Sequence, residues 1–357
     1  MANEWQKDRS SGSVATWLLV GVFMIMIQVL LGGITRLTGS GLSITEWKPI
    51  MGALPPMNEQ DWNIAFDKYK QIAQFKYLNP HFTLEDFKFI FFWEWLHRLW
   101  ARLIFIVFII PFTIFIVQRR IRKEMIRPLI ILLLLGALQG LVGWIMVQSG
   151  LEDSELIFVS HYKLAIHFIL ALGLLCYALW FALQLLIKPQ QLFFNRYLKK
   201  FTGWIIGFLV LQLTYGAFMA GLKAATAAPT WPGMNGAWWP ENTSSFGARQ
   251  FTGISVLTAH PLVVHFMHRN LAYLLLILLS IWTLNAFRFK GSELFRKTRV
   301  WPFVIVLLQV VLGILTLLFS IDKYSFLWLA VAHQFVAMVF LLSLVLMFYV
   351  NRDTKSV

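Results

Sequence analysis

The sequence is poor in the residues on which soluble enzymes and secreted domains depend. Only 13% of its 357 residues are charged, about half the fraction of a typical soluble domain. It holds a single cysteine, Cys176, which excludes an intramolecular disulfide and a CxxC metal or redox motif. Hydrophobic residues make up 58% of the chain, and its mean hydropathy is +0.67. One water-facing core cannot bury so much apolar surface, so the composition excludes a soluble enzyme and predicts an integral membrane protein.

Acidic residues are scarce as well. The chain has 31 Lys and Arg against 17 Asp and Glu, a net charge of +14. In a soluble protein this excess would indicate a nucleic-acid partner. Here the basic residues gather in short segments between apolar runs. Basic loops on the cytoplasmic side of a bilayer explain that distribution, so we expect a lipid bilayer and no nucleic acid as partner.

Eight stretches are apolar and long enough to cross a bilayer, which takes about 20 residues each. They are 14–34, 89–117, 128–148, 162–187, 202–222, 262–287, 301–320 and 326–350. The first is expected to be a membrane helix and not a cleaved signal peptide, because its apolar run is too long. The sequence therefore predicts an all-α integral membrane protein with eight transmembrane helices.

The basic residues also predict an orientation. More than half of them lie before the first span, after the eighth, or in the segments 118–127, 188–201 and 288–300. Because basic loops stay on the cytoplasmic side, both termini are expected in the cytoplasm. The long segments 35–88 and 223–261 then lie outside, where their Trp and Pro residues suit ordered interfacial loops.

The two halves of the chain are related by polar residues that recur in the same order. Gln28, Gly32 and Trp47 recur as Gln212, Gly216 and Trp231 at a constant offset of 184 residues, and three further matches follow: His97-Arg98 with His268-Arg269, Gln139 with Gln309, and His167 with His333. Four spans in each half predict two pseudo-symmetric four-helix bundles, related by an axis along the membrane normal. The predicted divisions are a cytoplasmic tail 1–13, a bundle 14–187, a linker 188–201, a bundle 202–350 and a tail 351–357.

Each half places one histidine near the start of its second span and one inside its fourth. These residues are His97 and His167 in the first half and His268 and His333 in the second. At 1.5 Å per residue all four are expected at similar depth, in the outer half of the bilayer. One such histidine would suit a buried polar group or a proton relay. Two matched pairs indicate imidazoles on facing helices that hold a heme iron from both sides.

The two halves differ beside these histidines. Glu94 lies one helical turn before His97 on the same face, and the equivalent position in the second half is His265. A carboxylate inside a membrane is costly and usually functional, although pairing with Arg98 or Arg102 is the alternative. The difference predicts that one bundle holds a reacting species and the other a permanent cofactor. His265 stays a second candidate ligand beside His268, because helical spacing does not separate them.

Several polar residues near the histidines have two interpretations each. Arg98 and Arg269 each follow a candidate ligand, and Arg36 follows the first span. One interpretation is that these arginines contact heme propionates, and the other is that their side chains extend to the membrane interface. Lys223 has the same two interpretations. Gln139, Trp144 and Gln309 are expected to form interhelical hydrogen bonds. The remaining histidines of the outer segments are expected to be solvated: His81, His161 and His260.

Several runs of the sequence resemble the heme A synthase family, over about residues 15–350. They are Gly33–Ser43, Phe92–Arg98, Leu138–Val147, Leu164–His167, His268-Arg269 and His333-Gln334. The resemblance implies an eight-helix enzyme of the cytochrome oxidase assembly pathway. Such an enzyme oxidises a peripheral methyl group of heme O to a formyl group by successive hydroxylations and so produces heme A. The single cysteine makes the chain similar to the cysteine-free subgroup of bacteria and mitochondria.

The resemblance also implies roles for individual residues. His97 and His167 match the iron ligands of the substrate heme, Glu94 matches the catalytic carboxylate, and His268 and His333 match the ligands of a heme b. The implied location is the bacterial inner membrane, and the implied partners are heme O synthase and cytochrome oxidase assembly factors. The alternative is a membrane cytochrome b that carries electrons between quinol and a partner, which does not account for the Glu94 and His265 difference.

Overall fold

Eight long helices dominate the computed structural model, which describes residues 9–47, 51–151 and 157–353. They are α1 (Arg9–Leu37), α4 (Leu84–Val117), α5 (Lys123–Leu151), α6 (His161–Leu186), α7 (Arg196–Leu222), α9 (Pro261–Phe287), α11 (Trp301–Leu318) and α12 (Lys323–Val350). Each is apolar and long enough to cross a membrane, α11 together with the short α10 (Glu293–Thr298) that precedes it. The prediction of an all-α membrane protein with eight spans is confirmed.

Several helices begin before the apolar runs that predicted them, because polar caps lie outside those runs. Thr83 begins α4 with a capping box, in which it exchanges hydrogen bonds with Asp86. The Asn195 side chain accepts from the backbone N–H of Leu198 at the start of α7. A cap satisfies backbone donors that the first turn of a helix leaves free, so it adds a turn that hydropathy does not record.

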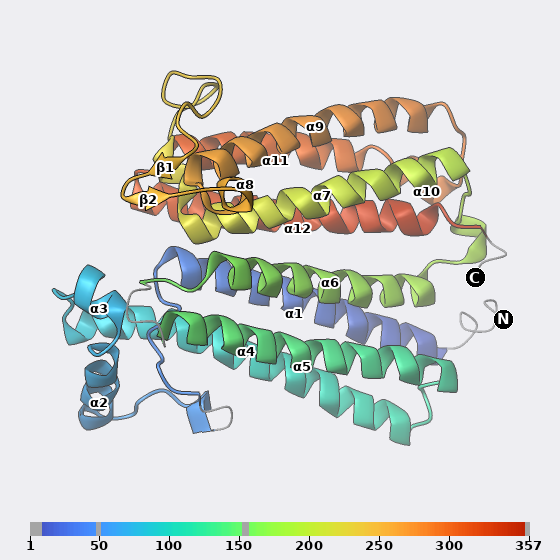
Figure 1. Cartoon of the computed structure of the whole chain (residues 1–357). Helices are drawn as coiled ribbons and strands as arrows, with labels where there is room; N and C mark the ends of the chain where they lie inside the picture. Colours follow the sequence, from blue (N-terminus) through green and yellow to red (C-terminus); the bar gives the residue numbers. More distant parts are fainter. Residues whose placement is uncertain (1–8, 48–50, 152–156, 354–357) are drawn as a thin grey trace.

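The helices of the two halves pack in different patterns (Figure 1). In the second half α7 packs on α9, α9 on α11, α11 on α12 and α12 back on α7, which closes a ring of four helices. In the first half α4 packs on α1, α1 on α6 and α6 on α5. Along the described residues the contact between α4 and α5 is at most marginal, so we call this group of four an open row.

The two groups meet along α1, α6, α7 and α12, where most of the buried apolar side chains lie. Leu175 of α6, Leu198 of α7 and Leu344 of α12 are fully buried there. Trp282 of α9 is also buried and donates its indole N–H to the Thr202 hydroxyl of α7. The contacts of α6 with α7 and of α1 with α12 are equivalent under the repeat, as the pseudo-symmetry requires. The exact division at residues 188–201 stays a prediction.

The long outer segments form small elements at the end of the molecule opposite the N and C termini (Figure 1). The first segment holds a 3₁₀ turn (Met51–Ala53), α2 (Glu59–Tyr69) and α3 (Ala73–Leu78). Phe66 and Tyr69 of α2 pack there against Phe87 of α4. The second segment holds a 3₁₀ turn (Ala224–Ala227), α8 (Ile254–Ala259) and the antiparallel strands β1 (Ser245–Phe246) and β2 (Arg249–Gln250). A last 3₁₀ turn, Pro189–Gln191, joins α6 to α7.

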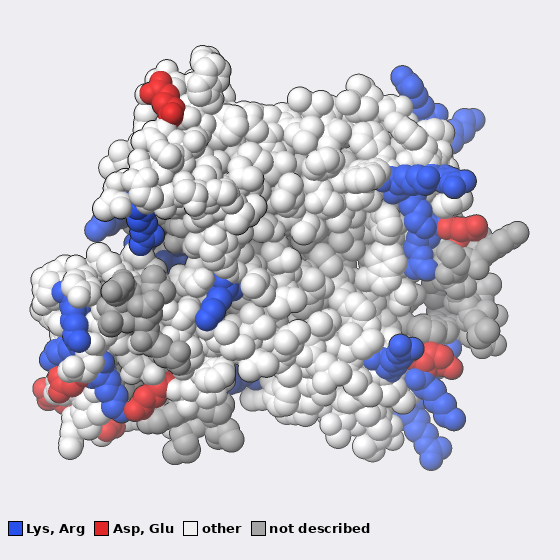
Figure 2. Space-filling model, viewed as in Figure 1, with Lys and Arg blue, Asp and Glu red and all other residues white. Residues whose placement is uncertain are grey.

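Charged side chains gather at the two ends of the helices and leave a broad uncharged band between them (Figure 2). Blue basic side chains dominate the end that carries the termini, whereas acidic and basic side chains mix at the other end. A band without charge suits the hydrocarbon core of a bilayer, and basic residues suit its cytoplasmic face. The cytoplasmic location of the termini stays a prediction that this distribution favours.

Candidate functional site

The histidine pair of the second half has a spacing that suits one metal ion. His268 on α9 and His333 on α12 face each other with ring centres 6.4 Å apart and ring planes at 71°. A bond from a metal to an imidazole nitrogen is about 2.0 Å long, so two rings that hold one ion have centres about 6 Å apart. The two residues therefore fit the axial positions of a single heme iron.

The two histidine rings of the first half are not in contact, in contrast to those of the second half. His97 lies on α4 and His167 on α6, near enough to interact electrostatically. In the described part of the chain no ring contact joins them, unlike His268 and His333. Because α4 and α6 both pack on α1, the pair still faces one space inside the open row.

Each of the four histidine rings packs against a glycine on a neighbouring helix. A Cβ atom built on these glycines would lie 2.9–3.2 Å from a ring carbon of the histidine. The four contacts are Gly32 with His97, Gly143 with His167, Gly216 with His268, and Gly313 with His333. Any larger residue would displace the ring, so glycine keeps a flat cradle open for each imidazole.

A glutamine precedes each of these glycines by one helical turn. The amide nitrogens of Gln212 and Gln309 lie 3.4 and 3.2 Å from the Nε2 atoms of His268 and His333. Gln28 lies 3.3 Å from both ring nitrogens of His97. Gln139 donates to the backbone oxygen of His167 at 3.4 Å. The expected interhelical hydrogen bonds of Gln139 and Gln309 are confirmed, and they form at the histidines.

The buried polar atoms around the histidines are incompletely paired. Among the described residues, the amide oxygens of all four glutamines have no hydrogen-bond partner: Gln28, Gln139, Gln212 and Gln309. The Nδ1 atoms of three of the four histidines also lack one: His167, His268 and His333. Buried unpaired polar atoms are rare in proteins. A histidine bound to metal through one nitrogen donates the other N–H to a nearby acceptor, so these atoms fit iron-bound imidazoles.

The spacing Gln-x-x-x-Gly in the sequence accompanies each of these contacts. In the first and fifth spans it identifies the repeat, through Gln28 with Gly32 and Gln212 with Gly216. It also recurs in the third and seventh spans, where the repeat alone does not identify Gly143 and Gly313 as contacts of the histidines. Four copies of one spacing, each opposite a span with a histidine, would have predicted the four helix pairs.

Glu94 is buried and fully hydrogen-bonded. One carboxylate oxygen accepts from the Ser43 hydroxyl at 2.7 Å and from the backbone N–H of Ile44 at 2.9 Å. The other oxygen accepts from Arg98, one turn along the same helix, at 2.5 Å. The pairing with Arg98 that the sequence left as an alternative is thus present. The hydrogen bonds and the Arg98 cation offset the cost of burying a carboxyl group one turn outside His97.

The three arginines that were candidates for propionate contacts have different surroundings. Arg98 also donates to the backbone oxygens of Ile44 and Glu46 in the loop after α1. Arg269 donates to three backbone oxygens of the loop after α7, those of Thr230, Pro232 and Gly233. Both therefore anchor the outer loop of their own half. Arg36 keeps one buried guanidinium nitrogen without a partner, and the propionate contacts stay predictions.

Histidines outside the two pairs have structural surroundings. His265 is buried on α9, one turn before His268. His260 is fully buried; it caps α9 by accepting from the backbone N–H of Val263 and contacts the backbone oxygen of Ser245. The expectation that His260 is solvated is wrong, because helix capping drew this side chain inward. His161 contacts the backbone oxygen of Thr258, whereas His81 is exposed.

Lys223 ends α7 in the left-handed conformation, with φ 53°. Its amino group lies 3.7 Å from the centre of the Phe158 ring. Burial, together with the nearby positive charge of Arg36, lowers the pKa of Lys223 to about 8. Two cations therefore lie close together at the outer ends of α1 and α7, where an anion would be attracted.

Comparison with known proteins agrees with this arrangement. The sequence model of the cytochrome oxidase assembly protein family matches residues 15–345. The chain belongs to this family. Members of the cytochrome oxidase assembly family with curated names include a heme A synthase of Flavobacterium psychrophilum, 38% identical over 97% of this chain and 100% of the relative. Others named heme A synthase come from Parvibaculum lavamentivorans, 40% identical over 93% and 92% of the two chains, and Novosphingobium aromaticivorans, 41% identical over 91% of each.

Proposed function

We propose that the chain is a heme A synthase, which oxidises a peripheral methyl group of heme O to a formyl group and so produces heme A. Two histidine pairs at the centres of two related helix groups carry the proposal, each imidazole against its own glycine. Curated relatives of nearly the same length with the name heme A synthase support it. The first half, 14–187, binds the substrate heme, and the second half, 202–350, binds a heme b.

The residues of the second half fit a permanent heme. His268 and His333 have the spacing of two axial ligands, and the closed ring of α7, α9, α11 and α12 surrounds them. His268 and His333 would hold heme b, which would supply a redox-active iron for the oxidation. The amide nitrogens of Gln212 and Gln309 contact the ligand rings and hold them in one orientation. Their unpartnered amide oxygens are available to accept from the second ring N–H.

In the first half His97 and His167 bind the iron of the substrate, and Glu94 is the catalytic carboxylate. Its hydrogen bonds to Ser43, Ile44 and Arg98 hold it in place one turn outside His97. A fixed carboxylate can stabilise positive charge that develops on the methyl carbon, and it accepts a proton as oxygen is added there. The corresponding residue in the second half, His265, offers no carboxylate, so only the first half performs the reaction.

The proposal extends to the surroundings of the enzyme. Basic residues at the end that carries the termini favour a bacterial inner membrane with both termini in the cytoplasm. The histidine pairs then lie toward the outer face. A heme O synthase that supplies the substrate and cytochrome oxidase assembly factors that receive the product are the proposed partners.

Conversion of heme O to heme A tests this function directly. Cells that supply heme O and express the protein should accumulate heme A, identified by chromatography of extracted hemes. Glu94→Gln should bind both hemes but lower heme A formation by about 100-fold or more, because a fixed proton acceptor is lost. Glu85→Gln is the matched control, since Glu85 lies on the same helix, exposed and paired with Lys88. Normal heme A formation by Glu94→Gln would contradict the assigned role.

A further inference from the structure

The two helix groups differ at one lateral contact. In the second half α9 packs on α11 and closes the ring. The equivalent helices of the first half, α4 and α5, make at most marginal contact in the described part of the chain. Each packs closely on one other long helix, α4 on α1 and α5 on α6. The first half is therefore less tightly closed toward the bilayer at this position than the second half.

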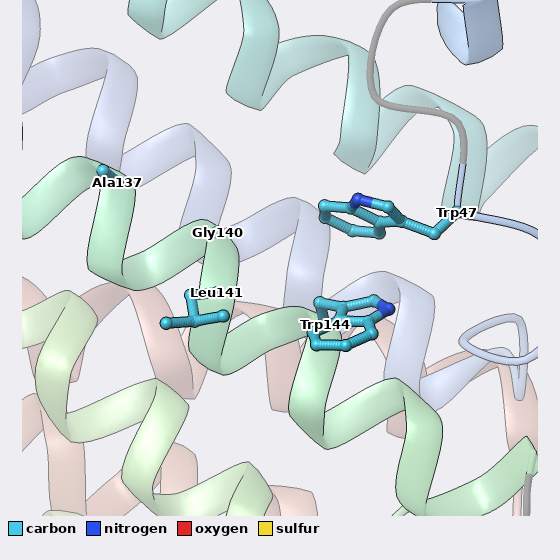
Figure 3. Close-up of a pocket in the computed structure, with 5 residues that line it drawn as sticks. All are labelled: Trp47, Ala137, Gly140, Leu141 and Trp144. Atoms are coloured by element: carbon cyan, nitrogen blue, oxygen red, sulfur yellow. The ribbon is translucent and has the colours of Figure 1, made fainter.

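An open apolar groove lies on the surface of α5, on the same side of the first half as the outer loop. It has a volume of about 470 Å³ and is lined by Trp47 of that loop and by Ala137, Gly140, Leu141 and Trp144 of α5 (Figure 3). A Cβ atom at Gly140 would meet nothing within 4 Å, so this part of the helix surface is bare. Gly143, one turn further along α5, contacts His167. The groove and the His167 contact therefore lie on consecutive turns of the same helix.

Two tryptophans cover the outer end of the groove. Trp47 and Trp144 have ring centres 6.2 Å apart, with the indole of Trp47 reaching from the outer loop to α5 (Figure 3). The loop of Trp47 is held on α4 by Arg98 through the backbone oxygens of Ile44 and Glu46. Trp47 therefore connects the α4 side of the opening to α5 at the membrane surface. Its counterpart Trp231 donates instead to the hydroxyl of Tyr273 on α9, within its own helix pair.

We propose that this groove binds the isoprenoid tail of heme O and that the opening between α4 and α5 is the side through which the substrate joins the first half. The inference rests on the proposed function. Heme O carries a long apolar chain, whereas heme b carries none. A closed ring of helices suits the tail-free cofactor, but a heme with a tail needs a gap in the ring. An apolar groove beside the gap stabilises that tail by removing it from the surrounding lipid through close packing.

A tryptophan at the bare position tests the assignment. Gly140→Trp fills the groove from α5, and Gly207→Trp is the matched control, since a side chain at Gly207 of α7 also meets nothing within 4 Å. Protein that retains heme b is titrated with heme O and, separately, with tail-free heme, and the bound hemes are identified by chromatography. Filling the groove should weaken heme O binding by about tenfold or more, with tail-free heme bound as in the unmodified protein. Retained heme b shows in the same sample that the variant is folded.

Other outcomes would overturn the assignment. Equal loss of heme O and tail-free heme would mean that the groove admits the ring and does not recognise the tail. Unchanged heme O binding would mean that only bilayer lipid covers the groove. Failure of the unmodified protein to bind any heme would instead refute the proposed function, so the two failures are distinguishable.

Discussion

The two halves of the molecule share their ligand geometry but differ in how they enclose it. Each half presents two histidines, each ring packed on a glycine that follows a glutamine by one turn. In the second half the four helices close into a ring, and a histidine, His265, lies beside the ligand. In the first half the ring is open between α4 and α5, and Glu94 takes the equivalent position. The two halves therefore share the contacts of their histidines and differ in how closely their helices pack and in the residue beside one histidine.

This contrast explains how one fold serves two purposes. A cofactor that stays bound benefits from enclosure on all sides, because every helix contact must break before it leaves. A substrate must enter and the product must leave, so one contact of the ring is absent. Glu94, the proposed catalytic carboxylate, lies only in the open half, which would keep the reaction away from the proposed heme b.

The largest effect is expected when one ligand is removed from either half. His268→Ala should lower bound heme b by well over tenfold and abolish heme A formation, because an axial ligand is lost from the closed ring. His97→Ala should lower heme O binding and leave heme b in place. Absorption spectra and chromatography of the purified variants measure both, with His81→Ala in the exposed outer loop as control. If His268→Ala kept its low-spin heme b spectrum, the ligand assignment would be wrong.

Alanine in place of the glycines that contact the histidines should lower heme binding less than loss of a histidine does, and by different amounts in the two halves. In Gly313→Ala the new Cβ lies 3.0 Å from His333, and in Gly143→Ala it lies 2.9 Å from His167. The closed ring cannot yield, so Gly313→Ala should lower heme b content severalfold. The helix of Gly143, α5, has a close contact with α6 but at most marginal contact with α4, so it can shift more easily and heme O binding should fall less. Gly207→Ala, with free space around its Cβ, is the control; equal losses would contradict the open row.

The smallest effect concerns the cations at the outer ends of α1 and α7. Because the pKa of Lys223 falls from 10.5 to about 8, the folded state binds its proton more weakly than the unfolded state. Protonated Lys223 therefore destabilises the folded state. This free-energy cost is fully present below about pH 8 and disappears as the pH rises toward 10.5. Lys223→Met should therefore raise the thermal unfolding midpoint at pH 7 by a few degrees at most, and the gain should vanish near pH 10. Lys188→Met, at an exposed position, should show no such trend.

Much of this molecule was predictable from its sequence, because apolar length and recurring polar residues are robust signals in a membrane protein. The eight spans and the pairing of His97 with His167 and of His268 with His333 follow from them. The gap between α4 and α5 does not, since residues that face lipid and residues that face another helix are equally apolar. The caps at Thr83 and His260 and the loop hydrogen bonds of Arg98 depend on backbone geometry that hydropathy does not record.

The central claim is that two histidine pairs each hold an iron porphyrin, one fixed and one exchangeable. The most direct measurement is chromatographic identification of the hemes in protein purified from cells that make heme O, before and after incubation with excess isotopically labelled hemes. The account predicts a heme b that stays unlabelled and a heme O or heme A that exchanges. Protein free of iron porphyrin, or two hemes that exchange equally, would contradict it.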